Sequence, residues 1–197
     1  EIRPRDWSSD VCSSDLARPK AAFDILTLKP VGKVCQASFT LAVSPALNIR
    51  TVDDLIKHTK ANPGKLSYGS IGHGSSQHLV AEMFSAAIGA DLLHVPYRGA
   101  APAAQDLAAG HVSMMFDVVS LALGPIKSGS VRALGVAAKE RVAVLPEVPT
   151  LAEGGHPLEV GAWFGLLAPA ATPPSIVGWL NREANRIFSA SDRKSAR

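Results

Sequence analysis

The sequence contains no long apolar run, few aromatic residues and only two cysteines in 197 residues. No segment approaches the roughly 18 apolar residues that a membrane-spanning helix needs. Cys12 and Cys35 lack the paired spacing of a metal site, and the sequence leaves open whether they form a disulfide. The net charge is only +3, and no basic stripe is interleaved with aromatics. We therefore expect no nucleic acid partner.

The first twenty residues also lack the apolar core of a signal peptide, because charged side chains interrupt them throughout. Their text repeats itself at Ser8–Asp15 (SSDVCSSD) and differs from the Ala-, Val- and Leu-rich sequence that follows. We interpret segment 1–20 as foreign or disordered, and we expect both ends of the chain to be truncated. The remaining composition, with 47% hydrophobic and 19% charged residues overall, is typical of a globular protein with a buried core.

The most informative stretch is Lys65–Ser76, KLSYGSIGHGSS. Alternation at Leu66 and Tyr68 predicts a strand, and glycines and serines follow it. A helix is then predicted from Gln77 to its C-terminal Gly89, with one apolar face formed by Leu79, Val80, Met83, Phe84, Ala87 and Ile88. A strand, a Gly/Ser loop and a helix N-terminus can hold a small anion. The alternative is an ordinary strand–helix turn that Ser75 or Ser76 caps.

The pattern continues with strands at Leu92–Val95, His111–Phe116 and Val131–Ala137, separated by helices at Ala101–Ala109 and Val118–Lys127. Such alternation predicts a parallel sheet, and ligands of such sheets lie beyond the carboxyl ends of the strands. That rule gathers Ser70–Ser76, Tyr97–Gly99 and Asp117 on one rim.

Further elements are predicted on both sides of this unit. A helix is predicted over Asp53–Lys60 after a capping-box-like start at Thr51, a buried strand covers Phe39–Val43, and another covers Trp163–Leu167. The two strands bracket the β/α unit and are candidates for the crossing segments between two lobes. A long helix then opens at Thr172-Pro173-Pro174, and its predicted inward face comprises Ile176, Leu180, Ala184, Ile187 and Phe188.

Six blocks of this sequence resemble one known family. They are PGKLSYGSIGHGSSQHL at Pro63–Leu79, HVPYRGAAPA at His94–Ala103, DLAAGHVSMMFD at Asp106–Asp117, VRALGVAAKER at Val131–Arg141, LPEVPTLAE at Leu145–Glu153 and WFGLLAPAATP at Trp163–Pro173. In this order, they resemble the extracytoplasmic solute-binding receptors of tripartite tricarboxylate transporters, the Bug receptors.

The resemblance implies an α/β, type II periplasmic-binding-protein fold whose two Rossmann-like lobes close on a small carboxylate. It assigns 21–44 to a remnant of lobe one, 45–161 to lobe two and 162–197 to the return to lobe one. The first lobe is expected to be largely truncated, because the family's opening ligand loop and second glycine-rich block are absent from this sequence. The implied parent protein is a periplasmic monomer that hands a di- or tricarboxylate, an amino acid or an aromatic acid to a two-component membrane permease, without a cofactor.

Carried onto this sequence, the resemblance implies a set of ligand-facing residues: Ser70, Gly72, Gly74, Ser75, Ser76, His78, Tyr97, Gly99 and Asp117. For several of them a structural role is the alternative. Ser70 either donates to a carboxylate or forms a turn, and Tyr97 either contacts the ligand or packs. Asp117 either binds an amine or hydroxyl of the ligand or fixes the loops, and His78 either faces the cleft or caps the helix.

Other functions find less support. His73, His78, His94 and His111 come singly from separate elements and show no i, i+4 ligand pair, so we expect no zinc site. A serine hydrolase is an alternative, since Ser, His and Asp all lie near the rim, but SYGSIGHGSS does not supply the G-x-S-x-G nucleophile elbow. The effector-binding lobe of a transcription regulator would need a helix-turn-helix segment, which this sequence lacks. We expect a binding protein, not an enzyme.

Overall fold

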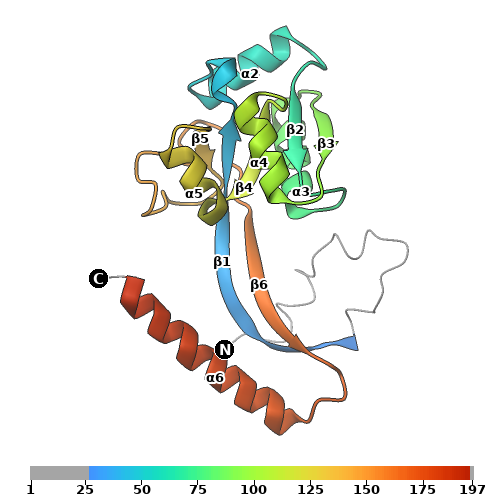
Figure 1. Ribbon diagram of the computed structural model, residues 1–197, viewed down its shortest axis with the longest axis vertical. Helices are drawn as coiled ribbons and strands as arrows, with labels where there is room; N and C mark the ends of the chain where they lie inside the picture. The colour runs from blue at the N-terminus through green and yellow to red at the C-terminus, as the bar shows by residue number, and fades with distance from the viewer. Residues whose placement is uncertain (1–26, 196–197) are drawn as a thin grey trace. The chain divides into compact units, whose positions relative to one another are not determined.

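The computed structural model describes residues 27–195, with side chains to residue 188, and the predicted segment 1–20 lies outside this range. The chain divides into two compact units. The larger unit is Ala37–Ala162, and the smaller one comprises the flanking segments up to Gln36 and from Trp163. Strands β1 (Lys29–Val43) and β6 (Gly161–Ala168) each contribute to both units and pair with each other (Figure 1).

The smaller unit contains the long helix α6 (Pro174–Ser195), which begins at a proline as predicted. The side-chain amide of Asn181 donates to the Val31 carbonyl, and Lys29 Nζ donates to the Thr172 carbonyl at 3.1 Å. The inward face predicted for α6 is wrong in part, because Ile176, Ile187 and Phe188 are exposed.

The larger unit is built on a sheet with the strand order β3-β2-β4-β1-β5. Strand β2 (Ser67–Ser70) runs parallel to β3 (Leu93–Pro96) and to β4 (Met114–Val118). Strand β1 is antiparallel to both β4 and β5 (Arg132–Val136), so β2, β3, β4 and β5 share one direction. The predicted parallel strands are therefore present, but β1 separates the last two. Its buried residues 39–43 fit that central place, since both sides of the strand are paired.

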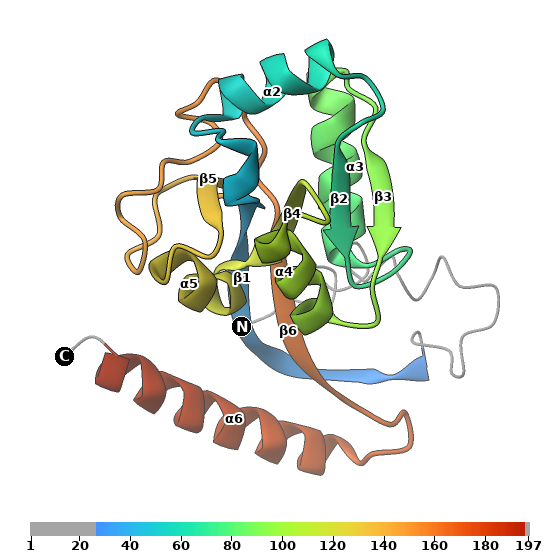
Figure 2. The ribbon, with the colours of Figure 1, turned by 45° about the horizontal axis from the view of Figure 1, so that its top comes forward.

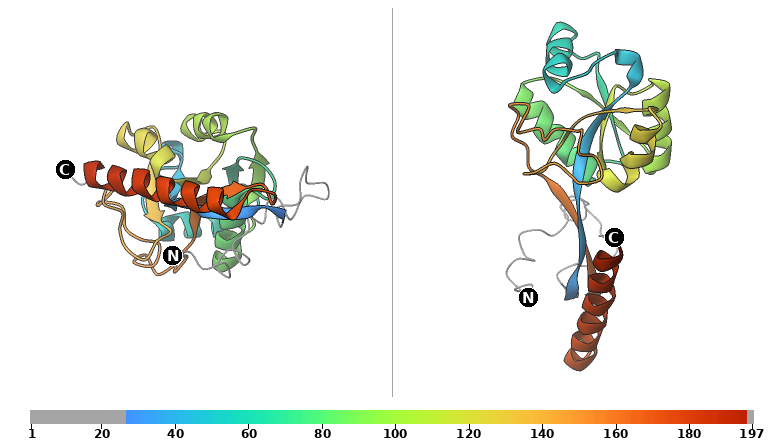
Figure 3. Two further views of the ribbon diagram at one scale, coloured as in Figure 1. Left: turned by 90° about the horizontal axis from the view of Figure 1, so that it is seen from below. Right: turned by 90° about the vertical axis from the view of Figure 1, so that its left-hand side faces the viewer.

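Helices cover both faces of this sheet, and side chains of successive strand residues alternate between the faces. Leu41, Met114 and Phe116 pack with α2 (Val52–Ala61) and α3 (Ser76–Ile88). Ala42 and Met115 face the other way and pack with α4 (Ala100–Ala109), beside Ile126 of α5 (Val119–Lys127). The right-hand view of Figure 3 separates the two helix layers. None of the helices in the described ranges is long and apolar enough to cross a membrane.

The helix boundaries follow local signals in the sequence. Thr51 Oγ1 caps α2 by accepting from the Asp54 amide at 3.0 Å, and Gly89 ends α3 in the left-handed conformation at φ 62°. Helix α5 continues through Pro125 to Lys127, so Gly124-Pro125 does not split it. The predicted apolar face of α3 is shifted, because Leu79 and Met83 are exposed whereas Val80, Ala81 and Phe84 are buried.

The core between α3 and the sheet yields a stability test. Phe84 is 1% exposed and meets Phe116 edge-to-face, with ring centroids 5.5 Å apart. Phe84→Ala is expected to lower the free energy of unfolding by about 3–5 kcal/mol, because it removes buried contacts and leaves a cavity. The neighbouring Met83 is 50% exposed, so Met83→Ala is expected to change stability by only about 0.5 kcal/mol. Urea unfolding of both variants is the measurement, and equal losses would contradict this packing.

Candidate functional site

The candidate site lies along one edge of the sheet in the larger unit. The parallel register places Ser70 opposite Pro96 and Gly69 opposite Met115, so β2, β3 and β4 end on the same side. The Tyr97 amide donates to the Ser70 carbonyl at 2.8 Å, which joins the ends of β2 and β3. Helices α3, α4 and α5 each begin after one of these strands, so their N-termini meet at this edge (Figure 2). We call this edge the rim.

The Gly/Ser loop after β2 is held by hydrogen bonds within itself. Ser75 is the N-cap of α3: its Oγ accepts from the His78 amide at 3.3 Å and donates to the Gly72 carbonyl at 2.7 Å. Gly72 and Gly74 have φ of 125° and 73°, a backbone conformation that other residues rarely adopt. The turn predicted as the alternative to an anion cradle is thus present. It leaves the first-turn amides of Ser76 and Gln77 without intrahelical acceptors, as at any helix start.

Ser70 turns its side chain inward rather than toward solvent. The residue has no exposed surface, and its Oγ accepts from the Gly72 amide at 3.0 Å and lies 2.6 Å from His94 Nε2. This geometry matches the turn-forming alternative for Ser70. A Ser–His contact is also what a hydrolase nucleophile needs, but a fully buried hydroxyl offers no access to a substrate.

The other two helices at the rim start without a side-chain cap. The N-cap of α4 is Gly99, at φ 134°, and the N-cap of α5 is Val118; neither N-cap residue makes a side-chain capping hydrogen bond, although the Val118 amide itself donates to Asp117 Oδ1 at 2.9 Å. Uncapped first-turn amides and the positive end of the helix dipole favour an anion. Gly99 was among the ligand-facing residues that the resemblance implied, whereas Val118 was not, and an apolar residue is unusual as an N-cap.

Tyr97 is half-buried, and its hydroxyl is already engaged. It donates to Asp106 Oδ2 at 2.6 Å, and the ring packs with the Ala103 and Val112 cluster beneath α4. Burial and the Asp106 carboxylate raise the pKa of Tyr97 to about 12. Tyr97 therefore anchors the loop before α4 to the later part of that helix. Asp106 was absent from the sequence-based set, because nothing in its spacing links it to Tyr97.

Asp117 lies within β4, one residue before the strand ends, and is 5% exposed. Its Oδ1 accepts from the Val118 amide at 2.9 Å, and the Gln77 side chain is hydrogen-bonded to the same carboxylate. Burial raises the pKa of Asp117 above its ordinary value. Through Gln77, this carboxyl ties the first turn of α3 to the end of β4, as the loop-fixing alternative expects.

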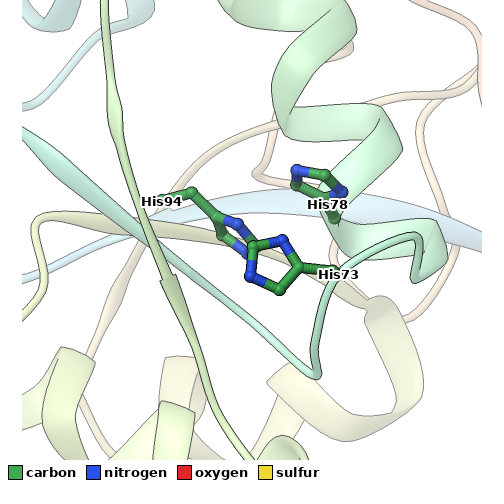
Figure 4. A group of neighbouring side chains, drawn as sticks. All are labelled: His73, His78 and His94. Atoms are coloured by element: carbon green, nitrogen blue, oxygen red, sulfur yellow. The ribbon is translucent and has the colours of Figure 1, made fainter.

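Three histidines meet beside the rim, although they come from separate elements. His73 lies in the Gly/Ser loop, His78 in the first turn of α3 and His94 in β3 (Figure 4). One ring nitrogen of each lies within 4.8 Å of the others. The three histidines are thus close together in space, although the sequence analysis expected no such cluster because they come singly from separate elements. His78 was in the predicted set, but His73 and His94 were not.

Comparison with known proteins places this geometry in context. Residues 10–193 match the family described as the tripartite tricarboxylate transporter family receptor. Protein BugT of Bordetella pertussis is 36% identical over 174 residues, which are 87% of this chain and 53% of BugT. This chain spans about half the length of the curated relatives it matches.

Solved structures also resemble this chain. The R. palustris protein Rpa4515 with adipate is 34% identical, with a TM-score of 0.81 over 84% of this chain and 56% of its own. MatC from Rhodopseudomonas palustris with bound malate is 30% identical, with a TM-score of 0.80 over 89% of this chain and 60% of its own. The fold is thus that of the periplasmic binding proteins of this type. The chain belongs to the tripartite tricarboxylate transporter receptors, the family that includes the Bug proteins.

Proposed function

We propose that the parent protein is a periplasmic receptor that binds a small dicarboxylate and delivers it to a two-component membrane permease, and that this chain supplies one carboxylate-binding rim. The observation that carries the proposal is the convergence of three helix N-termini at the rim, two of them uncapped. Adipate and malate, bound by the two structural neighbours, both carry two carboxylates. The rim belongs to the larger unit, which all nine predicted ligand-facing residues share.

Neutral donors explain how such a receptor can both bind and release. Amide groups and helix dipoles stabilise a carboxylate without a buried lysine or arginine, so no unpaired buried charge remains after the ligand leaves. Arg98, the cation next to Tyr97 in the chain, is exposed. In this proposal Ser75 and Gly72 shape the loop, while the amides of Ser76 and Gln77 face the ligand.

The proposal predicts where dicarboxylates bind. Titrating adipate or malate into ¹⁵N-labelled protein, with EDTA present, should shift the amide signals of residues 71–77, 99–101 and 118–120 in a saturable way. A diamine of similar length, at matched ionic strength, should leave them in place, because helix N-termini repel cations. Dicarboxylate shifts confined to other parts of the chain would contradict the proposed rim.

Ser76→Pro removes one first-turn donor. Ser76 is the first residue of α3, a position that tolerates proline, and Ser75 before it has φ −68° and ψ 159°, which suits a residue preceding proline. The variant should weaken dicarboxylate binding by roughly 10-fold, the effect of losing one hydrogen bond to a charged group. Ser76→Ala keeps the amide and should bind within about 2-fold of the unchanged protein. Equal affinities of the two variants in the same titration would contradict the role of this amide.

A structural role for Asp117 predicts a pH dependence of stability. Because the folded pKa is raised, the folded protein holds a proton more tightly than the unfolded chain, so this group's contribution falls as pH rises through the raised folded pKa. Asp117→Asn should remove that fall, so its stability relative to the unchanged protein should improve between about pH 4 and about pH 7. Urea unfolding at both pH values is the measurement, with the exposed Asp91→Asn as control. Parallel pH profiles would contradict the raised pKa.

A further inference from the structure

The histidine cluster beside the rim has the composition of a metal site. The rings of His78 and His94 are stacked, with centroids 4.2 Å apart, and His73 stands edge-on to both at 5.7 and 4.7 Å (Figure 4). The three candidate ligand atoms all lie within 4.8 Å of one another. Imidazole nitrogen is a preferred ligand of Zn²⁺ and of the neighbouring transition metals.

The second nitrogen of His94 has a hydrogen-bond partner, and that of His78 lies near a carboxylate. When Ser70 Oγ donates to the Gly72 carbonyl, it accepts from His94 Nε2, which leaves a lone pair on His94 Nδ1. His78 Nδ1 accepts from the Gly74 amide at 3.0 Å, so its proton is on Nε2, which lies 3.9 Å from Glu82 Oε1. A hydroxyl or carboxylate on the far nitrogen is the usual support of a metal-binding histidine.

A carboxylate lies beside the histidine cluster. Glu82, whose carboxylate also accepts from the buried Tyr68 hydroxyl, is the acidic group next to the cluster. It supplies negative charge beside a bound cation without joining the three ligand atoms.

Closing the site requires only local movement. Two nitrogens bound about 2.1 Å from a tetrahedral zinc lie roughly 3.4 Å apart, so the present separations need to shrink by up to about 1.4 Å. His73 is exposed and lies between Gly72 and Gly74, which can adopt backbone conformations that other residues rarely reach. The stacked rings of His78 and His94 would rotate so that their lone pairs converge, and the metal would replace the Gly74 amide at His78 Nδ1.

We propose that His73, His78 and His94 bind one divalent transition-metal ion of the Zn²⁺ class, with the fourth position open to water or an anion. This proposal reverses the sequence-based expectation that no zinc site exists. It rests on the three rings alone and not on the proposed function, because it needs no dicarboxylate.

The test is calorimetric titration with Zn²⁺ of the full chain without a polyhistidine tag, in a Cys12→Ser, Cys35→Ser background that removes the thiols. We expect one ion per chain, with affinity that falls as the pH is lowered, because protons compete with the metal for the ligand nitrogens. His73→Ala should weaken binding by about 100-fold or more, since losing even an outer partner of a metal ligand costs 10–100-fold. The exposed His73 is suited to this change, and circular dichroism verifies folding.

His111→Ala is the matched control, because His111 is exposed and bonded to Asp106 outside the cluster. It should retain affinity within about 2-fold. The ring ¹⁵N signals of the three cluster histidines should also move on Zn²⁺ addition, while those of His111 stay. Failure to bind Zn²⁺, or equal affinity in the His73→Ala and His111→Ala variants, would overturn the proposal. The carboxylate titrations contain EDTA, so their outcome is separate from this one.

Discussion

The parallel ladder between β2, β3 and β4 is the constraint on which the site depends. Its register places Ser70, Tyr97 and Asp117 at one end of three neighbouring strands. Each strand then leads into a helix, so three helix N-termini follow from the same geometry. The hydrogen bonds of the rim act on top of this frame: Tyr97 to Asp106, Asp117 to Gln77, and Ser70 to His94.

The side chains that were predicted to face the ligand are not the hydrogen-bond donors that remain available at the rim. Four predicted side chains are already hydrogen-bonded to neighbouring protein groups: Ser70, Ser75, Tyr97 and Asp117. Backbone amides in the first turns of the three helices have no intrahelical acceptors. The side chains thus hold the loops in shape, and in the proposed function the main chain binds the ligand. Main-chain donors cost little conformational entropy when a ligand arrives, because the helices already fix them.

The sequence predicted the alternation of strands and helices because apolar periodicity and caps are local signals. Thr51, Ser75 and Gly89 act where their residue types indicated. The antiparallel insertion of β1 between β4 and β5 was not predictable, since strand order depends on pairing between residues far apart in the chain. The histidine cluster was not predicted from the sequence for the same reason. His73 and His94 are 21 positions apart, and only the pairing of β2 with β3 brings them together.

The short edge strand β3 bears on how this sheet meets other molecules. It has four residues and ends in Pro96, which has no amide hydrogen to donate. A foreign strand that aligned with this open border would gain few intermolecular hydrogen bonds before the proline stopped the ladder. This edge therefore disfavours the repeated strand addition that leads to aggregation, even though Leu93 is 61% exposed.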